Sequence, residues 1–112
     1  MIYYIWLKDN CIQFEFQPKM KKLRYEFEGK IHTYTPDFWL IAEDRLIDVK
    51  GDHFLEDGKL INPFDRTLDG LYAAKQKCMI ENHVELILTG STEFNEIRQQ
   101  VISKYTYHIF CK

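Results

Sequence analysis

The sequence lacks most of the features that define a protein class at first sight. Its 112 residues include only three prolines and five glycines, with no repeat and no stretch rich in proline, glycine and serine. No apolar run approaches the roughly 20 residues that a membrane-spanning helix needs, so we expect no membrane partner. One domain over residues 1–112 is therefore the simplest organisation.

Cysteine is also scarce. Cys11, Cys78 and Cys111 form an odd, scattered set without CxxC spacing, which predicts reduced thiols and argues against a zinc site. The opening MIYYIWLKDN is apolar but has no basic n-region and no small-residue cleavage site, so we expect no signal peptide. Both observations favour a cytoplasmic protein.

Charge of one sign is not in excess either. The formal net charge of −2 gives the chain no general attraction for nucleic acid or acidic membranes. A polyanionic partner must therefore be met by a local basic cluster or by a metal ion. The one strong basic cluster comprises Lys19, Lys21, Lys22 and Arg24. It suits a nucleic-acid backbone, and a solvated basic turn is the alternative.

What the sequence does have is apolar and aromatic residues in regular patterns. Hydrophobic residues make up 46% and aromatic residues 15%, which is typical of a globular domain. Alternating or short apolar runs predict strands at residues 12–17, 23–28, 31–35, 37–42, 45–50, 84–88 and 107–111. Helical patterns cover residues 67–82 and a later segment that Ser91 or Thr92 caps. This order predicts an α/β fold with a mixed central β-sheet flanked by helices.

Two of these segments have further features. Residues 51–66 contain two glycines, Asn62 and Pro63 and predict a long loop, which in so small a domain is more often functional than idle. In the predicted helix at residues 67–82, apolar residues cover most of the circumference. We therefore expect that helix to pack on several sides.

The most informative stretch is YTPDFWLIAEDRLIDVKGDH, at residues 34–53. It holds two apolar runs of the kind that form buried strands. Yet Asp37 stands before the first run, and Asp48 and Lys50 stand at the end of the second. Charged side chains in these places call for a reason, because buried strands do not normally carry them.

A two-residue turn at Glu43-Asp44 sets the expected pairing of the two strands. It places Asp37 opposite Lys50 and Trp39 opposite Asp48. Because side chains alternate with a period of two, Asp37, Asp48 and Lys50 then share one face at the open end of the hairpin. A slip of one residue would separate them, so this prediction depends on the turn.

Two converging carboxylates repel each other unless a cation lies between them. Oxygen ligands suit Mg²⁺ or Mn²⁺, and the backbone carbonyl of Val49 is a further candidate ligand. Lys50 is placed to orient or deprotonate an attacking water, or to neutralise charge on phosphorus. Metal-assisted phosphodiester hydrolysis is the chemistry that this set suggests. The alternative is a solvated cross-strand ion pair between Asp37 and Lys50.

The same residues carry a family resemblance. Pro36-Asp37, ten residues, and then Asp48-Val49-Lys50 resemble the PD-(D/E)XK nuclease superfamily, which has the restriction-endonuclease-like fold. The stretches YTPDFWL and LIDVKG are similar to those of phage and transposon-type members of this superfamily. The resemblance spans about residues 12–90, although only the PD and DVK stretches are specific. It implies an endonuclease acting on DNA, with Asp37 and Asp48 as metal ligands and Lys50 as the catalytic lysine.

One departure from that family concerns a third acid. Many members carry a further acidic residue on a helix before the first strand, whereas the opening MIYYIWLKDNC holds no glutamate and Asp9 is a poor substitute. Either two acids suffice, or a partner chain supplies the third, or activity is reduced. The alternative function is therefore a catalytically impaired nuclease-fold domain that binds nucleic acid or a protein partner.

Other residues are candidates for contact with nucleic acid. Lys75 lies in an apolar stripe of the predicted helix and either reaches the site or extends to water. His53 follows the motif and either touches a phosphate or is a plain loop histidine, and Lys22 belongs to the basic cluster. Phe54, Phe64 and Trp39 are expected to be core or loop anchors rather than platforms for bases. Since 112 residues leave no room for a separate recognition domain, we expect a homodimer or a module of a larger nucleoprotein complex.

Overall fold

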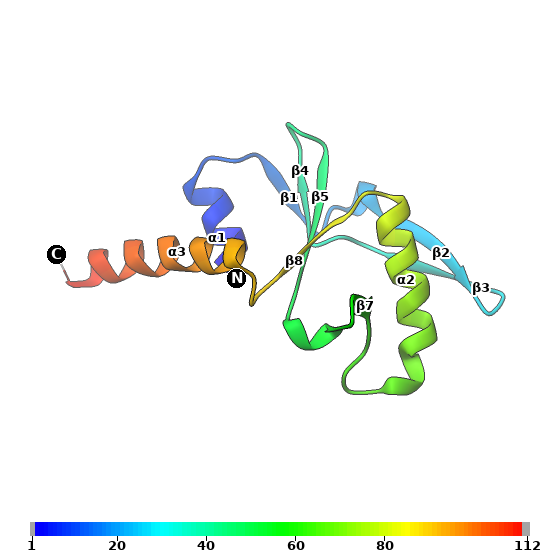
Figure 1. Ribbon diagram of the computed structural model, residues 1–112. Coiled ribbons are helices and arrows are strands. Elements are labelled where there is room, and N and C mark those ends of the chain that lie inside the picture. The colour runs from blue at the N-terminus through cyan, green and yellow to red at the C-terminus, as the bar shows by residue number, and fades with distance from the viewer. Residues whose placement is uncertain (1, 111–112) are drawn as a thin grey trace.

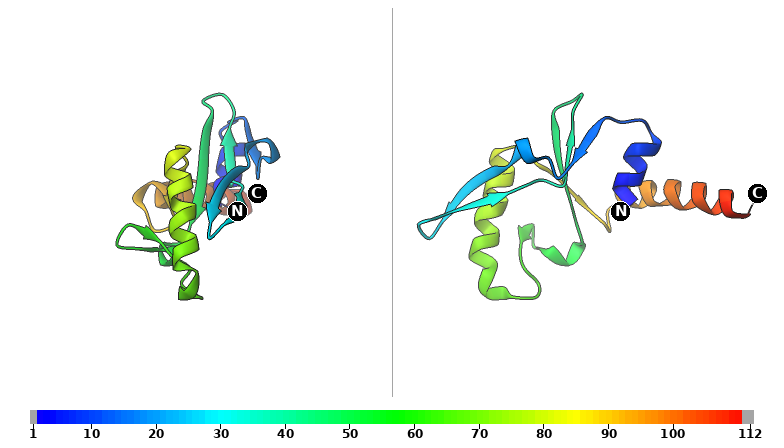
Figure 2. Two further views of the ribbon diagram at one scale, coloured as in Figure 1. Left: turned by 90° about the vertical axis from the view of Figure 1, so that its right-hand side faces the viewer. Right: turned by 180° about the vertical axis from the view of Figure 1, so that it is seen from behind.

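A computed structural model describes the backbone of residues 2–110 and the side chains of residues 2–106. The molecule is elongated, with principal extents of 58 × 29 × 17 Å. A twisted sheet crosses its middle, with α1 (Ile2–Asp9) and α3 (Thr92–Phe110) on one side and α2 (Asp69–Glu81) on the other (Figure 1). The view from behind shows the same division, with α3 extending away from the body (Figure 2).

The central sheet is mixed, as the sequence predicts. Its strand order is β1-β4-β5-β8, with bounds β1 (Phe14–Phe16), β4 (Phe38–Leu40), β5 (Arg45–Lys50) and β8 (Glu85–Leu88). The first three strands pair antiparallel, and β8 lies parallel to β5. Parallel neighbours need a crossover, and α2 supplies it. The α/β class with a mixed sheet flanked by helices is therefore confirmed.

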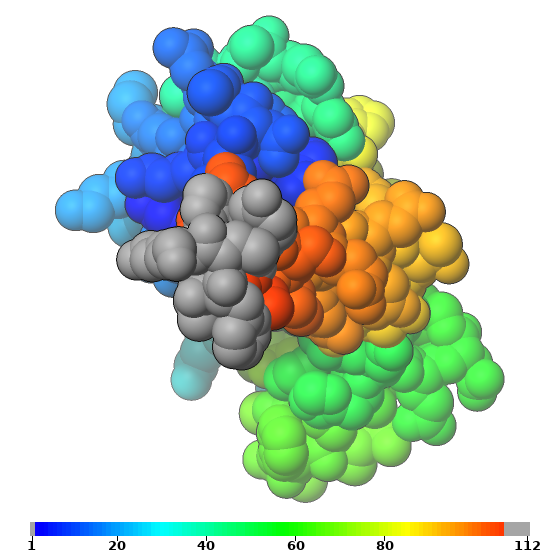
Figure 3. Space-filling model, turned by 90° about the vertical axis from the view of Figure 1, so that its left-hand side faces the viewer, coloured from blue at the N-terminus to red at the C-terminus, as the bar shows by residue number. Residues whose placement is uncertain are grey.

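Each face of the sheet has its own core. On one face, side chains of β4, β5 and β8 pack against α1 and α3; the buried members are Tyr3, Leu7, Phe38, Leu40, Ile47, Ile87, Phe94 and Ile97. The space-filling view shows residues of α1 and α3 packed against each other (Figure 3). On the other face, Met79 of α2 packs with Tyr34 and Leu60 in a smaller cluster. The alternation of side chains along the strands produces this division.

Two hairpins complete the fold. The first joins β2 (Leu23–Phe27) to β3 (Lys30–Tyr34). Its turn is Glu28-Gly29, one residue earlier than Gly29-Lys30, the position expected from the sequence; both turn residues have positive φ, as a tight two-residue turn requires. The second hairpin pairs β6 (Leu55–Glu56) with β7 (Lys59–Leu60), inside the stretch predicted as a loop.

Short 3₁₀ helices fill much of the remaining chain. They are η1 (Lys19–Lys21), η2 (Asp52–Phe54) and η3 (Arg66–Leu68). The last of these leads directly into α2. The region predicted as a long loop is thus a series of short, ordered elements rather than a structureless connection.

The expectation of a last strand is wrong. Residues 107–110, expected to form a strand, continue α3; Cys111 lies outside the described residues. No glycine or proline follows Ser91, whose hydroxyl accepts a hydrogen bond from Phe94 N at 3.2 Å, so nothing stops the helix once it has begun. Helix α2 contacts β2, β7 and η3 and buries Cys78 and Met79, whereas Ile80 is 67% exposed.

None of the helices within residues 2–110 is both long enough and apolar enough to cross a membrane.

Candidate active site

The β4–β5 hairpin has a different register from the one predicted. Leu40 pairs with Arg45, and Phe38 pairs with Ile47, so four residues rather than two form the turn. The pairing is shifted by two positions. Because two is the period of a strand, the shift leaves every side chain on its predicted face. Its effect is to bring Asp37 opposite Asp48 instead of opposite Lys50.

The longer turn has a local cause. A two-residue turn of the type that matches strand twist needs positive φ at both central residues, here Glu43 and Asp44. Only Asp44 adopts it, with φ of 50°. Its carboxylate accepts a hydrogen bond from Trp39 Nε1 at 2.8 Å, and its N–H donates to Ile41 O at 3.2 Å. These two bonds hold the turn in its four-residue form.

At the open end of the hairpin, the two carboxylates are interlocked with the backbone. Asp37 N donates to Asp48 Oδ1 at 3.2 Å, and Val49 N donates to Asp37 Oδ2 at 2.9 Å. The Asp48 side chain is only 1% exposed. Each acid is therefore fixed in place by the strand opposite its own, which is rigid support for a reactive group.

The electrostatics of this pair are unfavourable for two full negative charges. Burial, and after it the charge of Asp48, raise the pKa of Asp37 to about 6. Lys50 offsets part of the repulsion, since its Nζ lies 3.4 Å from Asp48 Oδ2. The arrangement thus favours the binding of additional positive charge.

Two buried oxygens at this place have no hydrogen-bond partner among the described residues. They are the hydroxyl of Tyr34 and Oδ2 of Asp48. The contact of Lys50 with that oxygen is an ion pair without hydrogen-bond geometry. Burial, followed by the nearby charge of Asp48, raises the pKa of the Tyr34 hydroxyl. Buried polar atoms are normally paired, so these two mark a position suited to a polar ligand.

Helix α2 brings a second lysine to the same face. Lys75 Nζ lies 4.7 Å from the ring centroid of Tyr34 and 5.6 Å from that of Tyr72. Burial, and next the charge of Lys50, lower the pKa of Lys75. The ammonium of Lys75 therefore lies beside the acidic pair rather than extending to water.

The structure does not bring the other two predicted nucleic-acid contacts to the carboxylates. His53 is exposed and packs its ring 4.6 Å from that of Phe54. Lys22 is exposed after η1. Among the described residues, no hydrogen bond or ion pair connects either side chain to Asp37 or Asp48.

Arg98 is a residue that sequence reasoning missed. With Asp37 and Val49 it lines a cavity of about 400 Å³ at the end of the sheet. Its guanidinium lies 5.1 Å from the Phe94 ring and donates to Thr89 O at 3.4 Å. No acidic side chain within the described residues forms an ion pair with it. The available signal was its position four residues after Phe94, on the inner face of the second predicted helix.

A larger depression lies elsewhere. It has a volume of about 680 Å³ and lies between α1 and β1, lined by Tyr4, Lys8, Phe14 and Phe16 among others. It contains neither Asp37 nor Asp48, and no pair of buried charges. Size alone does not identify a reactive centre, whereas perturbed acids beside cations do. We therefore place the candidate active site at the carboxylates.

The donor atoms fit a magnesium-type ion in part. Asp37 and Asp48 offer carboxylate oxygens, and Oδ2 of Asp48 is free of hydrogen bonds. Lys50 O accepts from Thr89 N on the β8 side, so the alternation of the strand turns the Val49 carbonyl toward Asp37. Such an ion often takes only one or two carboxylates and completes its shell with water and substrate phosphate.

A third acid is not found beside this pair. No group of three or more His, Cys, Asp or Glu side chains able to hold a metal occurs in the described part of the chain. Asp9, the only acid in α1, forms an ion pair with Lys104 at 3.5 Å. Any site here therefore has two carboxylate ligands from this chain.

Comparisons of the chain with protein-family models, with curated proteins and with solved structures found no match. No relative or solved structure therefore adds a functional residue to those described above. The resemblance to PD-(D/E)XK nucleases stays a prediction that rests on residues 36–50.

Proposed function

We propose that the protein is a divalent-metal-dependent endonuclease of the PD-(D/E)XK type, with a restriction-endonuclease-like version of its α/β fold, and that it hydrolyses phosphodiester bonds of DNA. One observation carries the proposal: Asp37 and Asp48 face each other across the hairpin, with Lys50 in contact with Asp48. A solvated ion pair at strand ends, the alternative, does not bury a carboxylate to 1% exposure.

The roles of the side chains follow from their positions. Asp37, Asp48 and the Val49 carbonyl would hold Mg²⁺ or Mn²⁺, which when bound polarises a phosphate oxygen and acidifies a water. Lys50 orients the attacking water, whose oxygen forms the new bond to phosphorus. The attacking water gives up a proton to solvent, the bond from phosphorus to the leaving oxygen breaks, and that oxygen takes up a proton from solvent. Lys50 also offsets the negative charge that develops on the phosphate.

Two further cations support binding of a polyanion. Lys75 lies on the α2 face of the sheet, beside Lys50, and Arg98 lies in the cavity that Asp37 lines. Together they flank the acidic pair from both faces. A strand of DNA crossing the end of the sheet would have cations on either side of its scissile phosphate, which lowers the repulsion from the two carboxylates.

The second candidate function is a nuclease-fold domain that binds nucleic acid or a protein partner without cutting. The observation that favours it is the lack of a third acid in the described residues. A homodimer, or assembly into a larger nucleoprotein complex, is compatible with both functions. A homodimer would let two sites act on two strands.

A cleavage assay separates the two functions. Wild type, Asp48→Asn and Lys50→Ala are incubated with plasmid, single-stranded and branched DNA in Mg²⁺ or Mn²⁺. Lys77→Ala is the control for Lys50→Ala, because it also removes a lysine, one whose side chain is 78% exposed on α2. We expect wild type and Lys77→Ala to cut and the other two variants not to cut. Equal cleavage by all four proteins, or by none, would overturn the proposal.

A further inference from the structure

Three aromatic rings form a cluster in the segment after β5. They belong to His53, Phe54 and Phe64, and we call them the aromatic cluster. His53 and Phe64 are exposed, and Phe54 is half-buried against the smaller core. The His53 ring lies 4.6 Å from Phe54 and 5.9 Å from Phe64, and the two phenylalanine rings are 6.2 Å apart. Phe64 is 80% exposed, so of the two positions expected for it, in the core or as an anchor of its loop, the core is excluded.

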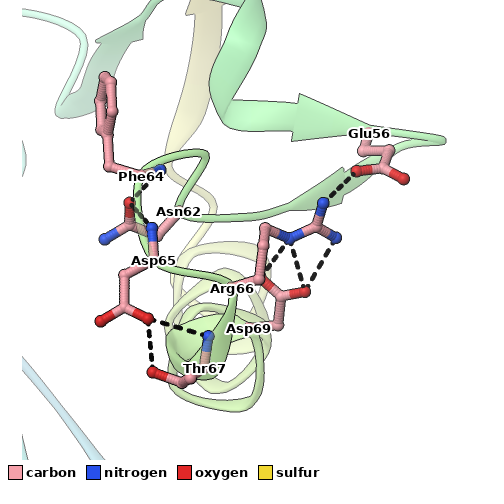
Figure 4. A network of polar contacts seen from close by, with 7 residues as sticks. All are labelled: Glu56, Asn62, Phe64, Asp65, Arg66, Thr67 and Asp69. Atoms are coloured by element: carbon pink, nitrogen blue, oxygen red, sulfur yellow. Dashed lines mark hydrogen bonds and ion pairs between the residues drawn. The ribbon is translucent and has the colours of Figure 1, made fainter.

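The position of Phe64 is fixed by the loop that carries it. Asn62 Oδ1 accepts hydrogen bonds from Phe64 N at 2.9 Å and from Asp65 N at 3.2 Å. Asp65 in turn accepts from Thr67 N at 3.0 Å. In the close-up, the Phe64 ring points away from this network (Figure 4). The exposure of the ring thus comes from an ordered backbone rather than from a loose loop.

The same loop is fixed at its other end. Arg66 forms ion pairs with Glu56 at 3.0 Å and with Asp69 at 2.9 Å, and so connects β6 to the start of α2 (Figure 4). Each of these exposed pairs is weak alone, but together they join three segments. The chain therefore holds a large apolar ring in water at a defined place.

The aromatic cluster is continuous with the candidate active site. Lys50 Nζ lies 5.7 Å from the ring centroid of Phe54, and Phe54 is the ring next to Phe64. Two consecutive contacts thus connect Lys50 to the exposed ring of Phe64. The first is 5.7 Å from Lys50 Nζ to the Phe54 ring, and the second is 6.2 Å between the rings of Phe54 and Phe64. The residues that connect them are Gly51 and η2, directly after β5. A polynucleotide strand with its phosphate at Lys50 would bring a neighbouring base within reach of Phe64.

We propose that Phe64, supported by His53 and Phe54, is a stacking platform for an unpaired nucleobase of the bound strand. This proposal rests on the proposed function and narrows its substrate class to nucleic acid with a single-stranded segment beside the cleavage site, such as a flap, a gap or a branch. A base in a continuous duplex is already stacked on both faces, so its face is not available to Phe64. Aromatic rings next to cations are the combination by which proteins bind single strands.

The continuity of the aromatic cluster with the candidate active site favours a nucleic acid over a second copy of this chain. Lys50, whose Nζ pairs with Asp48, also lies 5.7 Å from the centroid of the Phe54 ring. A base stacked on Phe64 would therefore bring an adjacent phosphate beside the acidic pair and its lysine, whereas an apolar protein surface would bring no group for that site. A protein occupant is nevertheless a distinct outcome of the test below.

The test uses a DNA with a 2-aminopurine in a 5′ overhang and a blunt duplex of the same length, with Ca²⁺ in place of Mg²⁺. Stacking on an aromatic ring quenches 2-aminopurine fluorescence, so the signal reports base contact independently of cutting. The proteins are wild type, Phe64→Ala, Phe64→Trp and Ile80→Ala. Ile80 is the matched control, an apolar side chain that is 67% exposed on α2. Circular dichroism checks that each variant is folded.

We expect Phe64→Ala to bind the overhang DNA about 5- to 100-fold more weakly and to lose the quenching, because one stacked base contributes that factor. Binding of the blunt duplex should not change, and Phe64→Trp should restore both signals. Ile80→Ala should behave as wild type. Unchanged overhang affinity and quenching in Phe64→Ala would overturn the platform, as would a change of oligomeric state in that variant without a change in DNA binding.

The outcomes also separate this proposal from the nuclease proposal. If wild type cuts DNA and Phe64→Ala cuts overhang and blunt substrates in the wild-type ratio, the platform is wrong and the nuclease stands. If wild type never cuts but shows quenching that depends on Phe64, the nuclease is wrong and the platform stands as part of a binding domain.

Discussion

Lys50 of β5 and Lys75 of α2 bring their ammonium groups to the same pair of carboxylates, from two different elements. The charge of Lys50 is the second cause, after burial, of the lowered pKa of Lys75, so the two cations are close neighbours. Like charges remain this close only where opposite charge compensates them, and here Asp37 and Asp48 do so. The result is a site of two carboxylates and two ammonium groups, positioned by a sheet and a helix.

Replacement of Lys75 by methionine tests its part in this group. Methionine keeps an unbranched apolar side chain but removes the ammonium group that lies over the rings of Tyr34 and Tyr72. We expect the melting temperature to stay level or rise, since a half-buried charge is lost, and DNA cleavage to fall about tenfold or more, since a charge-assisted contact to phosphate is lost. Lys77→Met is the control. Equal cleavage by both variants would show that Lys75 serves packing alone.

Stability should depend on pH through Asp37. Its pKa of about 6 in the folded protein is above the usual 3.8, so the folded state holds the proton more tightly than the unfolded state. The contribution to stability is complete below about pH 4 and is lost as pH rises to about 6. Because Asp37 is partly exposed, we expect a loss of only about 1 kcal/mol.

Asp37→Asn removes this dependence. The amide cannot ionise, and its oxygen can still accept the hydrogen bond from Val49 N. Urea unfolding in the presence of a chelator should show the variant to be more stable than wild type at pH 8 and equal to it at pH 4. Cleavage should be lost. A variant less stable than wild type at pH 8 would contradict the repulsion between the two acids.

The buried hydroxyl of Tyr34 gives a third prediction. It lies near enough to Asp48 for that acid to raise its pKa, but no contact there has hydrogen-bond geometry. Its removal therefore breaks no well-formed hydrogen bond. We expect Tyr34→Phe to leave the free energy of unfolding unchanged or to raise it by up to about 1 kcal/mol. Tyr34→Ala, which empties part of the smaller core, should lower it by about 3–5 kcal/mol. Chemical denaturation measures both; a large loss in Tyr34→Phe would reveal a hydrogen bond that the hydroxyl makes in solution.

Metal binding should appear as a shift of the melting temperature. At a concentration 100 times the dissociation constant, a ligand of the folded state stabilises it by about 2.7 kcal/mol, which is several degrees for a domain of this size. We expect Mn²⁺ to raise the melting temperature of wild type and of Asp9→Asn, whose lost carboxylate belongs to the pair with Lys104. Asp37→Asn and Asp48→Asn should show no shift. A shift of the melting temperature as large as that of wild type, in either of these two variants, would show that the ion binds at another place.

The sequence predicted the face on which the acids meet but not the partner of each. Alternation along two strands is enough to place Asp37, Asp48 and Lys50 on one face. The register was wrong by two positions because it depends on the turn, and the turn depends on the bond between Trp39 and Asp44, which no local pattern predicts. Because the predicted register differs from the observed one by an even number of positions, the predicted face of each side chain is right although the predicted pairs are wrong.

Other parts of the site come from contacts across the fold. Arg98 and Asp37 are 61 positions apart in the sequence and meet only because α3 packs at the end of the sheet. Phe64 was assigned to an apolar environment by its type, whereas its loop holds it in water. Aromatic and β-branched residues near the end of the chain predict a strand. They belong to α3 instead, because no helix-breaking residue interrupts that helix.

The turn at residues 41–44 has a practical consequence for engineering. All four of its residues are exposed, and the two strands that it joins carry the acids at their far ends. If the strands re-pair after an insertion, an even number of added residues keeps both acids on one face, whereas an odd number turns one strand over. A short label or affinity tag with an even residue count could therefore be inserted here, which would let the protein be immobilised with its reactive end free.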